Sequence, residues 1–162
     1  MMKPFLMTLL GASLLSGCGQ SQADQKDTAV RFVAEKTAPS GPPFSPVVKA
    51  GGVYYLAGHL GRNPKTLSYE PNIAAQTTQT LKNIGQTLSS VGVSMSDIVR
   101  CQVFMTDIAG FAEMNRAYRQ FFPTNPPART TVEVSGLAAP DALIEIECTA
   151  VPRDLFRKLN NE

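Results

Sequence analysis

The two residues best suited to chemistry in this chain are Arg129 and Glu145, both near its C-terminus. Arg129 begins an alternating apolar/polar run, 129–134, and Glu145 lies inside a second one, 143–151. Alternation is typical of half-buried strands, and the segment between the runs contains Gly and Pro, so the two runs predict an antiparallel strand pair. A guanidinium binds a carboxylate through two parallel hydrogen bonds, and a carboxylate in a strand can orient a water or pass a proton. The pair predicts either a site for a small carboxylate or a structural salt bridge.

The composition is that of a globular protein without strong net charge. The chain has 162 residues, of which 43% are hydrophobic and 17% charged, and its formal net charge is +2. This length is enough for one domain with a buried core, and the absence of a Lys/Arg cluster argues against a nucleic acid partner. One His and three Cys show no metal-ligand spacing, and no glycine-rich nucleotide motif occurs. We therefore expect no metal and no cofactor.

The N-terminus predicts export and lipid attachment. Residues 1–17 combine a basic head, an apolar run too short to span a bilayer, and small residues directly before Cys18. This order resembles a bacterial lipoprotein signal, so Cys18 is expected to carry lipid once residues 1–17 are removed. A cleaved signal peptide with an incidental Cys is the alternative. By analogy with bacterial lipoprotein sorting, Gly19 in place of Asp favours a periplasmic, outer-membrane-anchored protein.

The rest of the chain divides into a tether, one domain and a tail. Residues 18–36 comprise the lipidated Cys, a polar tether and a possible first strand at 31–36; residues 37–153 form the domain, and 154–162 the tail. Strands are expected over 47–50, 53–57, 97–107, 129–134 and 143–151, and helices over 72–91 and 108–122. This order predicts an α+β domain with one sheet and two helices packed on one of its faces.

The other face of the sheet is expected to bury itself against a second copy of the chain. In the run 143–151, Ile144 and Ile146 share one side of the strand, and Glu145 lies on the other. If the helices cover the apolar side, Arg129 and Glu145 belong to the uncovered face. A pocket formed by this face would then lie between subunits.

Three further residues are candidates for a site. Gly58 follows a strand and suggests a close backbone approach. His59 is the only His and is a candidate general base, although the sequence shows no partner for it. Asn115 interrupts an apolar helical stripe, so it either ties a loop in place or lines a pocket.

Several motifs in this chain resemble one known family. They are Pro-Ala-Arg-Thr-Thr-Val-Glu-Val (127–134), Ile-Glu-Ile-Glu-Cys-Thr-Ala-Val (144–151), Ala57-Gly58-His59, Asn63-Pro64-Lys65-Thr66, Asp97-Ile98-Val99 and Asn115-x-x-Tyr118-x-x-Phe121-Phe122. Together they are similar in order and spacing to the YjgF/RidA family of reactive-intermediate (enamine/imine) deaminases, and the resemblance extends from about Thr37 to Arg153. It implies a chorismate-mutase-like fold with a single mixed sheet, assembled as a homotrimer with clefts between subunits.

The resemblance also implies a reaction and a set of site residues. Family members hydrolyse 2-imino acids, formed from enamines such as 2-aminoacrylate, to 2-keto acids and ammonia. Arg129 matches the family's carboxylate-binding Arg, Glu145 the Glu that positions the attacking water, Gly58 a substrate-contacting Gly and Asn115 a pocket Asn. Arg129 and Glu145 are thus the expected catalytic pair, and Phe44, Gly58, Asn115, Arg129 and Thr131 the expected substrate-binding residues. A member that binds small carboxylates without catalysis is the alternative.

The chain departs from the family pattern at three of these positions. Phe44 stands in place of Tyr, Ala57 in place of Ser, and Thr131 in place of Cys. These departures bear on substrate range and rate more than on carboxylate binding. The family fold also places the strands of Cys101 and Cys148 side by side, so the two cysteines either form a disulfide or remain buried thiols. We expect thiols.

Overall fold

The computed structural model describes residues 30–32, 42–153 and 155, and for 30–32 only the backbone. The predicted signal peptide, Cys18 and most of the predicted tail lie outside these residues. The strands are β1 (Val30–Phe32), β2 (Val47–Ala50), β3 (Val53–Leu56), β4 (His59–Leu60), β5 (Ile98–Met105), β6 (Ala128–Glu133) and β7 (Ile144–Ala150). The helices are α1 (Ile73–Ser90) and α2 (Phe111–Arg119), each next to a short 3-10 turn, at Met95–Asp97 and Ile108–Gly110 respectively.

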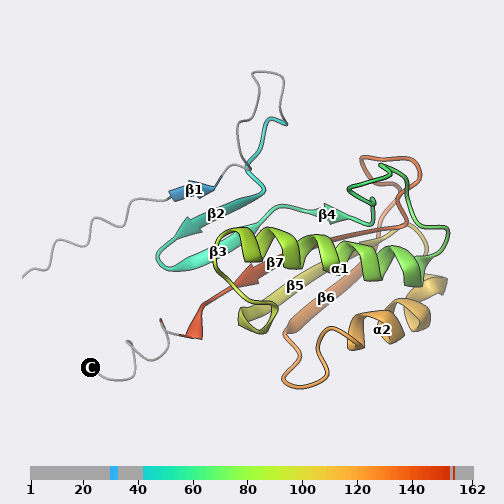
Figure 1. Cartoon of the computed structure of the whole chain (residues 1–162). Helices are drawn as coiled ribbons and strands as arrows, with labels where there is room; N and C mark the ends of the chain where they lie inside the picture. Colours follow the sequence, from blue (N-terminus) through green and yellow to red (C-terminus); the bar gives the residue numbers. More distant parts are fainter. Residues whose placement is uncertain (1–29, 33–41, 154, 156–162) are drawn as a thin grey trace, which may run out of the picture.

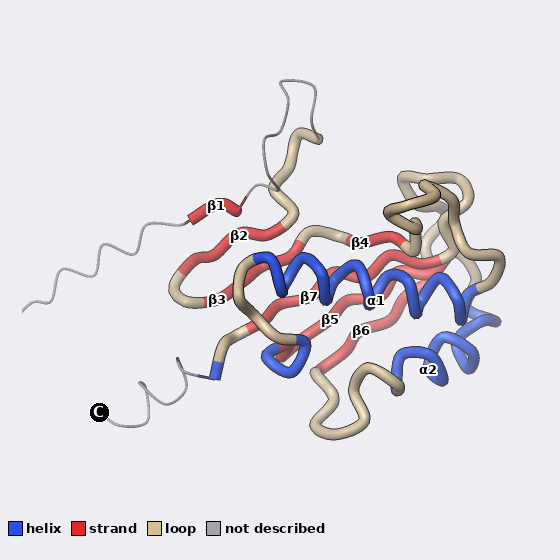
Figure 2. Tube along the Cα trace, in the orientation of Figure 1, coloured by secondary structure: helices blue, strands red, loops and turns tan. Residues whose placement is uncertain are grey.

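All the strands belong to one mixed sheet with both helices on the same side. Its order is β1-β2-β3-β7-β5-β6, and β4 pairs with β7 next to β3. The pair β5–β6 is parallel, and the other pairs are antiparallel. Figures 1 and 2 show α1 and α2 lying across the same face of the sheet. The predicted α+β class with two helices on one face is confirmed.

The predicted pairing of the last two strands is wrong. β6 and β7 are not neighbours, because β5 lies between them and pairs with both. The connection from β5 through α2 to β6 is a crossover, which is the connection that parallel strands need. The segment 134–143 then carries the chain back, so that β7 enters the sheet between β3 and β5. Alternation within a strand identifies its two faces but not its neighbours.

Local sequence signals explain the hairpin and the first helix. Gly51 and Gly52 have positive φ angles of 56° and 75°, as a two-residue hairpin turn requires. The Asn72 side chain accepts a hydrogen bond from the Ala75 amide (2.9 Å) and caps α1. After the helix ends, Gly92 adopts a φ of 73° that few other residues tolerate. These predictions are confirmed.

The core lies between the sheet and the helices. Leu81, Ile84 and Leu88 of α1 are fully buried, as are Ile144 and Ile146 of β7. Burying each such side chain contributes about 2 kcal/mol. In β5, Val99 is exposed although it alternates with the buried Cys101 and Val103, because a bulge shifts the register between Ile98 and Arg100. Among the described residues, no helix is both long and apolar enough to cross a membrane.

Cys101 and Cys148 form a disulfide, so the expectation of two free thiols is wrong. The two residues are directly paired in the β5–β7 ladder, with a Cα–Cα separation of 4.1 Å, and both are buried. Alternation placed both on the core side of their strands, but only the register brings them opposite each other. The bridge covalently joins two adjacent interior strands of the sheet.

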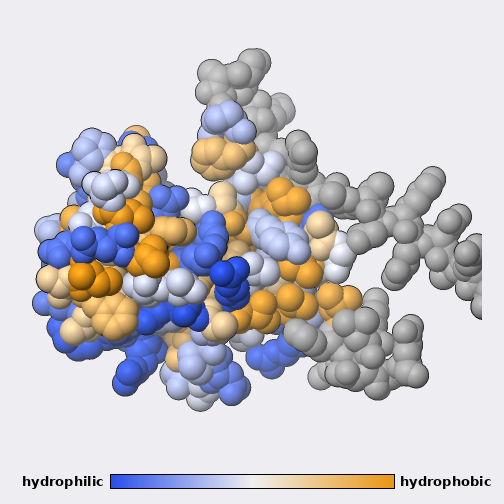
Figure 3. All heavy atoms as spheres, turned by 180° about the vertical axis from the view of Figure 1, so that it is seen from behind, coloured by the Kyte–Doolittle hydropathy of each residue, from blue (hydrophilic) through white to orange (hydrophobic). Residues whose placement is uncertain are grey.

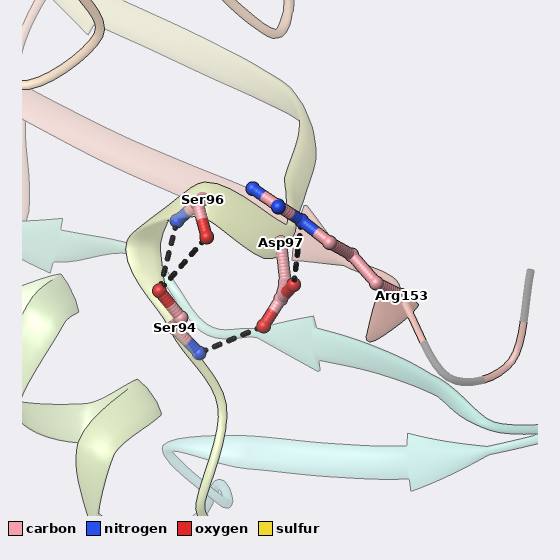
Figure 4. A network of polar contacts seen from close by, with 4 residues as sticks. All are labelled: Ser94, Ser96, Asp97 and Arg153. Carbon is pink, nitrogen blue, oxygen red and sulfur yellow. Dashed lines mark hydrogen bonds and ion pairs between the residues drawn. The ribbon is translucent and has the colours of Figure 1, made fainter.

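A polar network fixes the end of β7 to the turn before β5 (Figure 4). Asp97 accepts a hydrogen bond from the Ser94 amide (3.0 Å), while the Ser94 hydroxyl accepts one from the Ser96 amide (3.2 Å). Arg153 lies 4.0 Å from the Asp97 carboxylate, and the Val151 amide donates to the Asp97 carbonyl (2.8 Å). The arginine is largely exposed, so the ion pair itself contributes little. The backbone contact sets where the chain leaves the sheet.

Candidate functional site

The side chain of Arg129 projects from β6 toward α2, where four residues of the helix contact it. Its Nη2 donates to Asn115 Oδ1 (2.5 Å), and its Nη1 lies 3.8 Å from Met114 Sδ. The guanidinium carbon is 4.6 Å from the ring centroid of Tyr118 and 5.8 Å from that of Phe111. Both distances are within the range of cation–π attraction. We call Arg129 with Asn115 and Thr131 the arginine half-site.

The position of Arg129 corrects the predicted face. In the parallel ladder Arg129 is paired with Cys101, so its side chain projects from the helix-covered side of the sheet. The prediction that Arg129 lies on the uncovered face is wrong, because β5, and not β7, is the neighbour of β6. Glu145 does lie on the uncovered face, since it alternates with the fully buried Ile144 and Ile146.

The charge of Arg129 has no acidic partner among the described residues. Neither of the ion pairs found there, Arg116–Glu113 and Arg153–Asp97, includes it. Its guanidinium is half-buried and contacts only neutral groups, namely an amide, a thioether and aromatic rings. The predicted alternative of a salt bridge with Glu145 is not found in the chain.

Two hydroxyl groups beside Arg129 are buried without a hydrogen-bond partner among the described residues. They belong to Tyr118 and Thr131, and Thr131 lies two residues from Arg129 on the same side of β6. Burial raises the pKa of Tyr118 to about 12, and the positive charge of Arg129 opposes that rise. The phenol is therefore neutral at any physiological pH.

Glu145 lies directly beside Gly58 on the helix-free face. A Cβ atom at Gly58 would overlap Glu145 Oε1, so this carboxylate lies directly against the glycine backbone. The predicted close approach at Gly58 is confirmed, and the approaching group is Glu145. Figure 3 shows this side of the molecule, where hydrophilic and hydrophobic residues are intermixed over the surface. We call Gly58 and Glu145 the glutamate half-site.

Phe44 lies in the loop that precedes β2. The Ala57 amide donates to the Pro46 carbonyl (3.0 Å), which fixes the end of that loop beside Gly58. The Phe44 side chain is 59% exposed, so it offers an apolar surface that nothing among the described residues covers. Its role as a wall of the site stays a prediction.

Two negative charges lie close together on β7. Burial raises the pKa of Glu145, and the neighbouring charge of Glu147 adds to that rise. Glu147 is itself bonded to the amide of Gln102. Glu145 therefore takes up a proton at a higher pH than an ordinary glutamate does.

His59 does not serve either half-site. Its Nδ1 donates to the Ala57 carbonyl (2.8 Å), and its Nε2 lies 2.8 Å from the Thr87 hydroxyl of α1. Burial lowers its pKa, although the bond to Ala57 acts in the opposite sense. The contact with Thr87 joins β4 to α1, and the bond to Ala57 fixes the ring, so both ring nitrogens have structural partners that the sequence did not reveal.

One supporting residue was missed in the sequence. The fully buried Gln76 donates to the carbonyls of Glu70 and Asp141 (2.9 Å each) and accepts from the Leu143 amide (2.8 Å). These bonds fix the chain just before β7 and so help to place Glu145. A polar residue next to the apolar stripe of α1 was the available signal, and it looked like an ordinary surface position.

No group of His, Cys, Asp and Glu side chains that could hold a metal ion occurs in the described part of the chain. The candidate residues Arg129 and Glu145 instead lie in the two separate half-sites above. One is cationic and lies on the helix-covered side, and the other is anionic and lies on the open side.

Comparison with known proteins identifies the family to which this chain belongs. The family described as Endoribonuclease L-PSP matches residues 35–152. The chain is 37% identical over 120 residues to the 3-aminoacrylate deaminase RutC of Acinetobacter baylyi, covering 74% of this chain and 94% of the relative. It is 38% identical over 109 residues to the chloroplastic Reactive Intermediate Deaminase A of Arabidopsis thaliana, covering 67% of this chain and 58% of that protein.

The fold comparison agrees. The crystal structure of the YjgF gene product from E. coli matches with a TM-score of 0.69 and 34% identity, covering 76% of this chain and 99% of that one. Sequence and fold thus point to the same group of proteins over most of the chain's length. This chain belongs to the Endoribonuclease L-PSP family, the family of the RidA and RutC proteins.

Proposed function

We propose that this protein is an imine deaminase that hydrolyses 2-imino acids, of the type derived from 2-aminoacrylate, to 2-keto acids and ammonia. The reaction takes place in clefts between the subunits of a homotrimer. The observation that carries the proposal is the half-buried guanidinium of Arg129, whose charge no described acidic residue neutralises. Such a group is suited to a carboxylate supplied by a ligand.

The proposed reaction needs orientation more than a strong nucleophile. Arg129 holds the substrate carboxylate, and Glu145 orients a water and accepts its proton. The water oxygen bonds to the imine carbon as the C=N π bond breaks, and Glu145 passes the proton on to the nitrogen. The hydroxyl proton of the resulting carbinolamine then moves to the nitrogen, through Glu145, as the C–N bond breaks, so that ammonia leaves and a 2-keto acid remains. Holding the reactants in line is worth several kcal/mol. Glu145 performs this role only when it is ionised.

The two half-sites argue for a site shared between subunits. Within one chain, Arg129 lies under α2 on one side of the sheet and Glu145 lies on the other side. β6, which carries Arg129, is also an edge strand of the sheet. A second copy can therefore bring its Glu145 to the Arg129 of the first, whereas one chain cannot.

The direct test follows the loss of 2-iminopropanoate generated in situ by an amino-acid oxidase. The purified protein is expected to accelerate this loss and to release ammonia. Slow spontaneous decay with and without the protein, combined with saturable binding of a 2-keto acid, would instead favour the alternative of a carboxylate-binding protein without catalysis. The Acinetobacter and Arabidopsis relatives are both named as deaminases, which supports the proposal that this protein is an enzyme.

Mixed assemblies test the shared site. Arg129→Ala and Glu145→Gln subunits, each inactive alone, are mixed in equal amounts by refolding or coexpression. Random assembly gives about one quarter of the interfaces both native residues, one from each subunit, so about one quarter of the native activity should return. No recovery from a confirmed mixed trimer would show that both residues act within one chain.

The acid side of the pH profile reports Glu145. Because its pKa is raised, activity should fall on the acid side at a higher pH than an ordinary glutamate would give. The Glu147→Gln variant removes the neighbouring charge, which lowers the pKa of Glu145 and should move the acid limb of kcat/KM to lower pH. Glu113→Gln, on the exposed side of α2, is the control. If the acid limb moves equally in both variants, the charge of Glu147 is not the cause of the shift.

Gly58→Ala tests the position of the carboxylate. The added Cβ overlaps Glu145 Oε1, so the carboxylate must move, and kcat should fall by about 10²-fold with little loss of stability. Gly136→Ala, where an added Cβ meets nothing within 4 Å, is the matched control. Full activity of Gly58→Ala would mean that the observed place of Glu145 is not the reactive one.

We further propose that the protein acts outside the cytoplasm, anchored by lipid on Cys18. The Cys101–Cys148 disulfide supports this location, because disulfides persist mainly in oxidising compartments. A Cys18→Ser variant should appear in the soluble fraction, while the native protein sediments with membranes. If the native protein and the Cys18→Ser variant sediment equally, the proposed lipid anchor is wrong.

A further inference from the structure

The groups that hold Arg129 have one property in common: none of them carries a negative charge. Nη2 donates to the amide oxygen of Asn115, and Nη1 approaches the thioether of Met114. The guanidinium faces the rings of Tyr118 and Phe111 at 4.6 and 5.8 Å. Arginines in structural roles are usually paired with a carboxylate, which fixes the side chain and cancels its charge together.

The holding groups come from one face of α2. Phe111, Met114, Asn115 and Tyr118 have the spacing i, i+3, i+4 and i+7, which places all four on the same side of a helix. Met114 and Tyr118 are buried, so their positions are fixed by packing, and Tyr118 also contacts the ring of Phe122. Asn115 places an amide in an otherwise apolar stripe. A carboxylate at this position would form a stronger hydrogen bond with Arg129.

We infer that this face of α2 is a neutral clamp, in which Met114, Asn115 and Tyr118 position the Arg129 guanidinium and leave its full charge for a ligand carboxylate. The inference rests on the proposed function, in which Arg129 binds the carboxylate of a 2-imino or 2-keto acid. Tyr118 acts here as a positioning residue through its ring. Its hydroxyl has no partner among the described residues, so the attraction to Arg129 does not depend on it.

The clamp explains why an amide occupies position 115. An aspartate there would accept the same hydrogen bond and add an opposite charge within 2.5 Å of Nη2. The guanidinium would then be neutralised from within the chain, and a ligand carboxylate would have to compete with that pair. An asparagine fixes the same geometry without this competition.

The experiment measures calorimetric binding of 2-oxobutanoate, a stable keto acid, to the full-length protein. Asn115→Asp should weaken binding by about 10²-fold, because the new ion pair competes with the ligand, while thermal stability stays unchanged or rises. Gln120→Glu, which makes the same amide-to-acid change at an exposed position after α2, should bind normally.

Tyr118 is tested by two substitutions that separate the ring from the hydroxyl. Tyr118→Leu should weaken 2-oxobutanoate binding by about fivefold and raise KM for 2-iminopropanoate with a smaller change in kcat, because the cation–π contact is lost. Tyr118→Phe keeps the ring and should restore the native affinity. A merely structural role would appear in Tyr118→Leu as a loss of stability and of kcat together, rather than as a change mainly in KM.

The outcomes separate the inference from the proposed function. If the native protein binds 2-oxobutanoate and Asn115→Asp binds it equally well, the neutral clamp is refuted and the carboxylate role of Arg129 stands. Equal affinity of Tyr118→Leu and Tyr118→Phe would remove Tyr118 from the clamp. If the native protein does not bind the keto acid, the carboxylate role itself fails, and the inference fails with it.

Discussion

Arg129→Ala is expected to lower kcat/KM for 2-iminopropanoate by about 10³-fold or more, which corresponds to about 4 kcal/mol of transition-state stabilisation. The loss has two sources. The substrate carboxylate loses a bidentate, charge-assisted pair, and the imine carbon is no longer held in line with the water on Glu145. The assembled protein should survive, because the described contacts of Arg129 are to a single helix and none is an ion pair.

Arg129→Lys provides the sharper comparison. A lysine keeps the charge but has neither the planar fork nor the face that stacks on Tyr118. Activity should therefore fall between the native and alanine levels, mainly through KM. Steady-state kinetics with in situ imine generation, alongside the oligomeric state by light scattering, make the measurement. Native activity in folded Arg129→Ala would eliminate the deaminase mechanism proposed above.

The second large effect is expected from the disulfide. Removing the bridge by Cys101→Ala with Cys148→Ala should lower the free energy of unfolding by about 4 kcal/mol in the chain-entropy account of a closed loop of this length. The separation of 47 residues between the cysteines makes the loop long, so the unfolded chain gains much freedom when it opens. Chemical denaturation of the native and double-variant proteins, both without reductant, measures the difference.

Thiol chemistry gives an independent reading of the same feature. In the unreduced, denatured native protein, Cys101 and Cys148 should resist alkylation and become reactive only after reductant is added. Each single Cys→Ala variant is the control, because it frees one thiol. Ready labelling of both cysteines without reductant would show that the bridge is absent, and the predicted loss of stability should then not occur.

The sequence was informative wherever a pattern is local. Alternation assigned Ile144, Glu145 and Ile146 to their correct faces, and the Asn72 cap located the start of α1. The close backbone approach at Gly58 could be predicted for the same reason, although the sequence did not identify Glu145 as the approaching group. The family resemblance supplied the roles, which the residues alone left open between catalysis, binding and a salt bridge.

The errors all concern which strands are neighbours. The face of Arg129 depends on its pairing with Cys101 in a parallel ladder, and nothing within 129–134 encodes that partner. The disulfide depends likewise on Cys101 and Cys148 meeting in register. The clamp on α2 has a visible helical spacing, but only the tertiary structure shows that this face meets Arg129.

The place of β7 in the sheet has a consequence for how the chain is made. β7 is the last strand in the sequence, yet it lies in the interior of the sheet and pairs with β3, β4 and β5. The sheet therefore cannot close during synthesis until residue 150 has left the ribosome, and contacts so distant in sequence form slowly. In the export proposed above, a sheet that has not yet closed would suit passage through a narrow translocation channel, after which β7 can insert and Cys148 can reach Cys101.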